Sequence, residues 1–355
     1  MKLEEIDPNF AVTRTIGDHT FCFTDCEQPP LRIYGLMREN GAFCRLPRSV
    51  AERVSEAVLA LYAHTAGGRV RFVTDSKRIA IRVASAETAL SPHMAFTAKA
   101  GFDVYAQSET QPLRYYGTFK PPIELGDGFE GIVDIGSGEQ LVTINFPLYG
   151  GVKKLWIGIE EGASMKAAPD YTYETPVVFY GSSITQGGCA SRPGTMYSSI
   201  VCRRLNCDFI NLGFSGAAKA EDAIVEYISG LDMRVFVLDY DHNASTAEYL
   251  RKTHEKVFLA VRAKHPDLPV IMMPRPKYYL KPKELERRET VERTYLNARA
   301  AGDKNVYYID NLQLTSVVRD DGTVDGVHPT DAGHLDMANA LTPVLERALK
   351  STVGK

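Results

Sequence analysis

The distribution of apolar residues changes near residue 163, and this change constrains the fold more than any other feature of the 355-residue chain. Before it, short β-prone runs such as RVRFVT, RIAIRV and QLVTINF are separated by Gly, Pro, Asn and Asp. Strands of this length and spacing predict a β-sandwich or jelly roll. One helix is predicted at residues 47–63, where apolar residues recur at the helical period.

After residue 163, buried strands alternate with helices. The strands are PVVFY, DFINLGF, RVFVLDY, PVIMMP and NVYYID, and a last helix is predicted from residue 331 to about residue 349. This alternation predicts an α/β domain whose parallel sheet is covered by helices on both faces. Because the chain is longer than one hydrophobic core usually serves, we expect a β domain at residues 1–162, a linker at 163–175 and an α/β domain at 176–355.

Composition and charge exclude several classes of partner. Hydrophobic residues make up 44% of the chain and charged residues 24%, as in ordinary globular proteins. The net charge of -3 provides no broad positive field, so we expect neither nucleic acid nor an anionic membrane as partner. The start MKLEEIDPNF is acidic, and no apolar run approaches about 18 residues. Together with six scattered cysteines, read as free thiols, this predicts a cytoplasmic protein.

Polar segments follow three of the predicted parallel strands, namely GSSITQGG, GFSGAAKAED and DYDHNAS. The carboxyl ends of parallel strands are where such domains place their chemistry. The first segment offers Ser182 and Ser183 as nucleophiles, and a serine nucleophile requires a base and a carboxylate that orients the base. An Asp three residues before a His occurs at Asp239/His242, Asp325/His328 and Asp331/His334, so spacing alone leaves the choice of base open.

Four ordered blocks, YGSSITQGG, NLGFSG, LDYDHN and VDGVHP, resemble the blocks of the SGNH (GDSL-like) hydrolases. The resemblance implies a flavodoxin-like parallel sheet and a serine esterase with Ser183 as nucleophile, His328 as base and Asp325 as the orienting carboxylate. Ser182 stands where the family usually has Asp. The sequence contains neither a cluster with metal-ligand spacing nor a phosphate-binding glycine-rich loop, so we expect no metal and no cofactor.

The same resemblance implies an oxyanion hole formed by the backbone N–H groups of Ser183 and Gly216 and by the side chain of Asn243, although DYDHN differs from the usual GxND. Without the resemblance, Gly216 is explained by a tight turn and Asn243 by a helix cap. Arg192, in the segment CASRPG, and His242 are candidate substrate contacts. The alternatives are a structural salt bridge for Arg192 and a solvated loop position for His242.

A second resemblance covers the first half of the chain. The segments RLP at 45–47, GFDVY at 101–105 and PLY at 147–149 resemble the GxDLY module, a β-sandwich that precedes SGNH domains in bacteria. Val104 replaces the Leu of the motif. The resemblance implies a domain that packs and shapes the active site rather than one with its own catalysis.

These observations predict an ester hydrolase that removes acetyl or other short acyl groups from a carbohydrate or a small polar substrate. An acyltransferase, a lipase or a thioesterase would use the same triad, and a carbohydrate-binding scaffold without catalysis is the alternative of another class. The α/β-hydrolases are excluded, because no serine lies in a G-x-S-x-G elbow.

Overall fold

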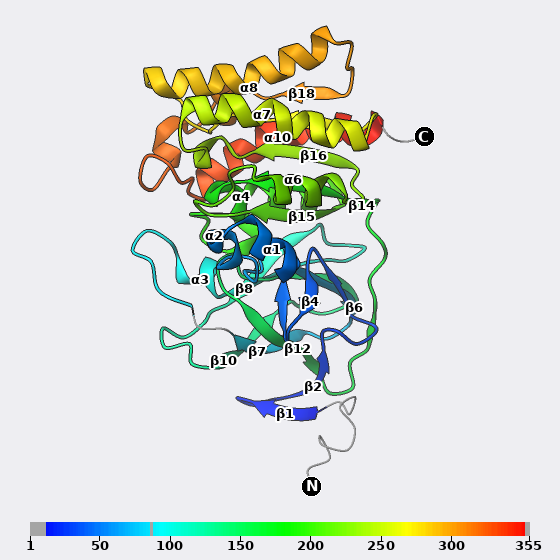
Figure 1. The fold of residues 1–355 in the computed structure, drawn as a ribbon. Helices are drawn as coiled ribbons and strands as arrows, with labels where there is room; N and C mark the ends of the chain where they lie inside the picture. The colour runs from blue at the N-terminus through cyan, green and yellow to red at the C-terminus, as the bar shows by residue number, and fades with distance from the viewer. Residues whose placement is uncertain (1–11, 86–87, 352–355) are drawn as a thin grey trace. The chain divides into compact units, whose positions relative to one another are not determined.

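The computed structural model describes residues 12–85 and 88–351 (Figure 1), which form two compact units. Within the described ranges, the first comprises residues 12–44, 63–85, 88–170 and 192–194, and the second comprises residues 45–62, 171–191 and 195–351. The segment MKLEEIDPNF lies outside the described residues, so the cytoplasmic location stays a prediction. None of the helices in the described ranges is both long and apolar enough to span a bilayer.

Antiparallel strands dominate the first unit. One sheet has the order β1-β2-β12-β7-β10, and a second has the order β13-β6-β11-β8-β9 with β3 added beside β6. The strands are β1 (Val12–Ile16), β2 (His19–Asp25), β3 (Arg32–Tyr34), β6 (Arg69–Thr74), β7 (Arg78–Ser85), β8 (Phe102–Gln107), β9 (Arg114–Phe119), β10 (Gly128–Asp134), β11 (Gln140–Asn145), β12 (Val152–Glu160) and β13 (Met165–Ala167). Strands β4 (Met37–Glu39) and β5 (Ala42–Cys44) form a hairpin, and α3 (Phe96–Lys99) is a single helical turn.

One apolar core joins the two larger sheets of this unit. On β7 the residues alternate, because Ile79, Ile81 and Val83 are buried in that core while Arg82 is exposed on the other face. Phe72 from β6 and Ile144 from β11 enter the same core from the second sheet. The period of two in the sequence therefore gives the predicted β-sandwich.

The second unit contains a parallel sheet of order β15-β14-β16-β17-β18. Its strands are β14 (Tyr173–Gly181), β15 (Cys207–Gly213), β16 (Val235–Asp239), β17 (Val270–Met272) and β18 (Val306–Tyr308). The larger helices are α5 (Tyr197–Leu205), α6 (Asp222–Ser229), α7 (Ala247–Lys264), α8 (Pro282–Ala300) and α10 (Asp331–Ser351), and the short ones are α4 (Ser183–Gln186) and α9 (Asn311–Leu314). The 3-10 turns are η2 (Pro193–Thr195), η3 (Asp241–Asn243) and η4 (Arg319–Gly322).

Helices cover both faces of this sheet, as predicted. Val178 and Tyr180 of β14 pack into the core that α6, α7 and α8 share. Phe179, which points to the other face, meets the ring of Tyr197 from α5 edge to face. In Figure 1, α7 and α8 run side by side over the sheet. Burial on both faces explains why these strands are almost continuously apolar.

Three local features differ from the sequence-based expectations. The helix expected at 47–63 is two helices, α1 (Arg48–Val54) and α2 (Glu56–Leu59), because Ser55 is extended and its hydroxyl caps α2 by accepting from the Val58 amide at 3.2 Å. Both helices belong to the second unit, and residues 192–194 belong to the first, so the chain passes between the two units five times instead of once at 163–175. Strand β13 lies inside the expected linker. The domain limits themselves stay a prediction.

Candidate active site

The predicted nucleophile lies at the turn between β14 and α4. Ser182 is the N-cap of α4, since its hydroxyl accepts from the Ile184 amide at 3.2 Å, and Ser183 is the first helical residue. Gly181 allows this turn to approach β16, because a Cβ at Gly181 would lie 2.4 Å from the Asp239 carbonyl oxygen. The capping role explains how a serine serves at the position that is usually Asp.

His328 and Asp325 meet Ser183 in the predicted arrangement. The Ser183 hydroxyl lies 2.9 Å from His328 Nε2, and His328 Nδ1 lies 2.8 Å from Asp325 Oδ2. The other carboxylate oxygen accepts from the backbone amides of Val327 at 3.0 Å and His328 at 2.8 Å. Gly326, at φ +81°, makes the turn in which a carboxylate can bond both the ring and the backbone of the residue three positions later.

These hydrogen bonds fix the protonation pattern of Ser183, His328 and Asp325. Partial burial favours the neutral carboxyl, but the bonds from the His328 amide and ring and from the Val327 amide outweigh it and lower the pKa of Asp325 to about 2. An ionised carboxylate only accepts, so Nδ1 of His328 donates to it. In the neutral imidazole, Nε2 is then the acceptor of the Ser183 proton, which is the tautomer that a general base needs.

The predicted oxyanion donors follow neighbouring strands of the sheet. Ser183 follows β14, Gly216 follows β15 and Asn243 ends η3, which follows β16. Gly216 has φ +69°, a conformation that side chains rarely adopt. The Asn243 side-chain amide donates to the Phe214 carbonyl at 2.7 Å, and the Phe214 amide donates to the Gly181 carbonyl at 2.9 Å. These bonds tie the three loops together, and an Asn side-chain amide carries a second N–H that can donate to a ligand.

The remaining Asp–x–x–His pairs have other partners. Asp239 accepts from Thr185 at 3.0 Å and from Tyr197 at 2.9 Å, and burial raises its pKa to about 7 despite these bonds. Asp331 begins α10 and accepts from the Ser191 amide at 2.8 Å and from the Ser191 hydroxyl. His334 is fully buried against Tyr197, whose amide donates to its Nδ1 at 3.3 Å. Ser183 is hydrogen-bonded to His328 at 2.9 Å and His328 to Asp325 at 2.8 Å, which favours Asp325/His328 over the other two pairs.

The two candidate substrate contacts lie in different units. His242, in η3, has a buried Nε2 without a hydrogen-bond partner among the described residues, and burial together with nearby Arg275 lowers its pKa to about 3. Arg192 groups with the first unit, where its guanidinium donates to Asp103 at 2.9 Å and to Tyr105 at 2.6 Å. These are the Asp and the Tyr of the GFDVY segment, so the salt-bridge alternative accounts for Arg192. Substrate contact by either residue stays a prediction.

Two supports of the site were not predicted from the sequence. Arg45 is buried in the second unit and donates to the carbonyls of Gly213 at 2.5 Å and Asn211 at 3.2 Å, which places a guanidinium under the loop that follows β15. The Asn211 side chain donates to the Thr185 carbonyl at 2.6 Å and so binds α4 to β15. Their partners lie far away in the sequence, and no local pattern indicates them.

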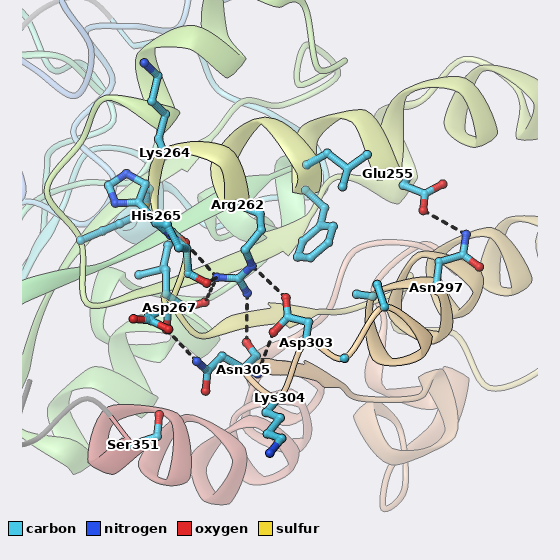
Figure 2. Close-up of a pocket in the computed structure, with 18 of the residues that line it drawn as sticks. Glu255, Arg262, Lys264, His265, Asp267, Asn297, Asp303, Lys304, Asn305 and Ser351 are labelled. Carbon is cyan, nitrogen blue, oxygen red and sulfur yellow. Dashed lines mark hydrogen bonds and ion pairs between the residues drawn. The ribbon is translucent and has the colours of Figure 1, made fainter.

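A hollow of about 1170 Å³ lies at the amino ends of the parallel strands, at the opposite end of the sheet from Ser183. Figure 2 shows Arg262 of α7 at its centre, beside Asp303. Its guanidinium pairs with Asp303 at 2.8 Å and donates to the backbone carbonyls of His265, Pro266, Leu268 and Asn305. Because this guanidinium is already bound to the chain, it joins α7 to the loops before β17 and β18 rather than serving a ligand.

Family models match both parts of the chain. Residues 174–346 match the GDSL-like Lipase/Acylhydrolase family, and residues 21–165 match the GxDLY module described as the N-terminus of Esterase_SGNH_hydro-type. The two matches confirm the two family resemblances that the sequence motifs indicate. A comparison with curated proteins found no match.

Solved structures of similar fold cover nearly the whole chain. A protein from Bacteroides ovatus ATCC 8483 assigned as a GDSL-like lipase is 26% identical, with a TM-score of 0.83 over 93% of this chain and 98% of its own. A salicylyl-acyltransferase from a tetracycline biosynthetic pathway is 20% identical, with a TM-score of 0.72 over 94% and 98%. A family two carbohydrate esterase from Cellvibrio japonicus is 12% identical, with a TM-score of 0.60 over 93% and 98%. The last two likenesses concern the fold alone.

Proposed function

Since this chain belongs to the GDSL-like lipase/acylhydrolase family and carries its GxDLY module, we propose that it is a serine-dependent ester hydrolase acting through an acyl-enzyme on Ser183. The observation that carries the proposal is the chain of hydrogen bonds from Ser183 through His328 to Asp325. A hydroxyl with a base at hydrogen-bond distance, and a carboxylate that orients that base, are what nucleophilic catalysis by serine requires.

Each group has a defined task in this mechanism. The hydroxyl oxygen of Ser183 attacks the ester carbonyl while His328 Nε2 takes its proton. Asp325 stabilises the resulting imidazolium. The imidazolium then gives its proton to the leaving alcohol, and the acyl group remains on Ser183. Water attacks this acyl-enzyme with His328 again as base. The negative oxygen formed in both steps would be bound by the N–H groups of Ser183 and Gly216 and by the amide of Asn243.

The substrate that we propose is a short acyl ester, foremost an acetyl ester, of a carbohydrate or another small polar alcohol. Its support is the fold shared with the family two carbohydrate esterase from Cellvibrio japonicus over 93% of this chain. A shared fold only selects which substrate to test first, because one fold serves many substrates.

Transfer of the acyl group to an alcohol other than water is the second candidate function. The likeness to the salicylyl-acyltransferase, with a TM-score of 0.72, favours it. The triad is the same in both cases, and the outcome depends on which nucleophile reaches the acyl-enzyme.

Hydrolysis of p-nitrophenyl acetate, butyrate and octanoate by the wild type and by Ser183→Ala tests the proposal. Ser182→Ala is the matched control, because it removes the neighbouring hydroxyl, which caps α4. We expect Ser183→Ala to lower kcat by about four to six orders of magnitude, while Ser182→Ala keeps most of the activity. A steep preference for acetate supports a short acyl group. A folded wild type without activity on any ester contradicts the proposal and favours a carbohydrate-binding scaffold.

Acetylated oligosaccharides, with and without a large excess of a second alcohol such as glycerol, separate hydrolysis from transfer. Free acetate as the main product supports the hydrolase. An acetylated glycerol that replaces most of the free acetate supports the acyltransferase, and its formation should also disappear in Ser183→Ala.

A further inference from the structure

The turn that carries Asn243 is built around a buried carboxylate. Asp241 is the first residue of η3, two positions after the end of β16, and only 1% of its surface is exposed. Asn243 ends the same turn and is the side chain that the proposed mechanism assigns to the oxyanion. The position of its amide therefore depends on how Asp241 is held.

Two buried arginines from other elements bind Asp241. Arg275, in the loop after β17, donates its backbone amide to Oδ2 at 3.0 Å, Nε to Oδ2 at 3.1 Å and Nη2 to Oδ1 at 3.1 Å. Arg287, on α8, donates Nε to Oδ1 at 2.8 Å. The three residues are between 1% and 8% exposed, so this is an ion-pair cluster inside the unit rather than a surface salt bridge.

Arg287 also binds the backbone on both sides of His242 and Asn243. Its Nη2 donates to the carbonyl of Asp241 and, at 2.9 Å, to the carbonyl of Ala244. One planar guanidinium thus joins the carboxylate and the two carbonyls that enclose the turn. Only arginine can form these bonds together, because its donors lie in a fixed plane, whereas a lysine presents one compact ammonium.

The cluster is a costly way to pack α8 against the sheet. Burial of charged groups requires their desolvation, and apolar residues of the same size would stabilise the fold as well or better. What the charges provide is a single geometry for the turn. Glu284 extends the arrangement, since it accepts from Lys277 at 2.8 Å and from Arg275 at 3.4 Å.

We propose that Arg287, supported by Arg275, is a positioning residue for the oxyanion hole. It holds the Asp241–Asn243 turn so that one N–H of Asn243 donates to the Phe214 carbonyl, at 2.7 Å, while the other points to the oxyanion. The inference rests on the proposed ester hydrolase function. It adds a role for α8, an element that supplies none of the reacting groups.

Arg287→Met is the test variant and Arg262→Met its matched control. Arg262 also binds an aspartate and several backbone carbonyls, but at the edge of the sheet where the strands begin (Figure 2). We expect Arg287→Met to lower kcat by about 10- to 100-fold, less than the loss of an oxyanion donor itself, with KM changed by less than about threefold. Arg262→Met should lower the melting temperature but leave kcat of the folded fraction nearly unchanged.

A double-mutant cycle with Asn243→Ala shows through which group Arg287 acts. In the Asn243→Ala background, Arg287→Met should reduce kcat by less than about threefold, because the amide that it positions is absent. Equal losses in both backgrounds, or a kcat of Arg287→Met equal to that of Arg262→Met, would overturn the inference. Arg287→Lys keeps the charge beside Asp241 if the Met variant does not fold, and it should show an intermediate loss of kcat.

Ser183→Ala, measured in the same series, separates this inference from the proposed function. If the wild type shows turnover that Ser183→Ala lacks, an unchanged kcat in Arg287→Met refutes the positioning role alone. A wild type whose turnover is absent or independent of Ser183 overturns both.

Discussion

Asp325/His328 and Asp331/His334 have the same spacing and lie within ten residues of each other, yet they occupy opposite environments. The Asp325 side chain is 37% exposed and that of His328 22%, and both lie in a loop between η4 and α10. His334 is completely buried inside α10. In the loop the carboxylate turns back onto the imidazole, whereas on the helix Asp331 binds Ser191 and His334 binds Tyr197.

The difference lies in the backbone rather than in the residue types. Gly326, with its positive φ, lets Asp325 wrap around His328, while the helical backbone directs Asp331 and His334 to separate neighbours. In this chain, the Asp and His three positions apart are hydrogen-bonded to each other in the loop, whereas those on α10 bind separate neighbours.

Replacing each of the two histidines by alanine tests most directly whether the two pairs differ in function. His328→Ala should lower kcat on a good ester by about four to six orders of magnitude, because triad members act as a unit. His334→Ala should leave kcat of the folded enzyme within about tenfold of the wild type, since this ring packs on Tyr197 and holds no reacting atom. Active-site titration together with circular dichroism would normalise kcat to folded enzyme. Comparable losses in both variants would contradict the assignment of the base.

Replacing the two carboxylates should change kcat by a smaller factor than replacing the histidines. Asp325→Asn should lower kcat by about three to four orders of magnitude, because the amide no longer enforces the tautomer with Nε2 as acceptor. Asp331→Asn should cost less than about tenfold, since it weakens only the bonds to Ser191. If Asp331→Asn abolished turnover of p-nitrophenyl acetate while Asp325→Asn did not, the choice between the pairs would be wrong.

The pH dependence of kcat/KM tests whether the Asp325 carboxylate stays ionised in acid. On the acid side kcat/KM should fall about tenfold per pH unit, because a protonated imidazole cannot accept the Ser183 proton. The pKa of Asp325 is lowered to about 2, so this carboxylate stays ionised and the slope should continue without a second inflection down to about pH 4. A further inflection between pH 3 and 5 would indicate that Asp325 loses its charge there.

The pH dependence of the free energy of unfolding, rather than of activity, should reveal the buried imidazole of His334. Burial lowers the pKa of His334 to about 4, whereas a histidine in an unfolded chain titrates near 6.5. The unfolded state therefore binds more protons between these values, and the stabilisation present above about pH 6.5 is lost as the pH falls through about 4, by about 3 kcal/mol at most. Urea unfolding of His334→Gln should show a flatter dependence over this range. An unchanged dependence would mean that other groups carry it.

The strands of the parallel sheet were predicted from the sequence more accurately than the short elements outside it. The strand expected at PVVFY is β14, the one at RVFVLDY is β16, and both agree to within a few residues because continuous apolar runs between turn residues are a local signal. The split at Ser55 was missed because the apolar period continues through it, while the backbone is extended there and the hydroxyl caps the next helix. Strand β13 was missed because three residues give no period.

Sequence motifs indicate the candidate catalytic residues, whose roles stay predictions, whereas supporting residues with distant partners were missed. Ser183 and His328, 145 positions apart, were paired only because both belong to recognisable blocks. Arg287 lies in a polar helix and 46 positions from Asp241, and nothing in its surroundings distinguishes it from the exposed arginines of α8. Long side chains that cross a core to a carboxylate leave no periodic signal, so such supports emerge only from the three-dimensional structure.

The interleaved course of the chain limits how this protein can be dissected or recombined. A fragment that began at Tyr171 would lack Arg45 and the two helices of Arg45–Tyr62, and would carry Arg192–Gly194 without the Asp103 that binds it. Each half would thus lose buried hydrogen-bond partners that the other half encodes. A chimera that exchanges either unit with that of a relative therefore has to replace three separate stretches of sequence and cannot be made at one junction. For the same reason, simple truncation is a poor way to assign activity to one part.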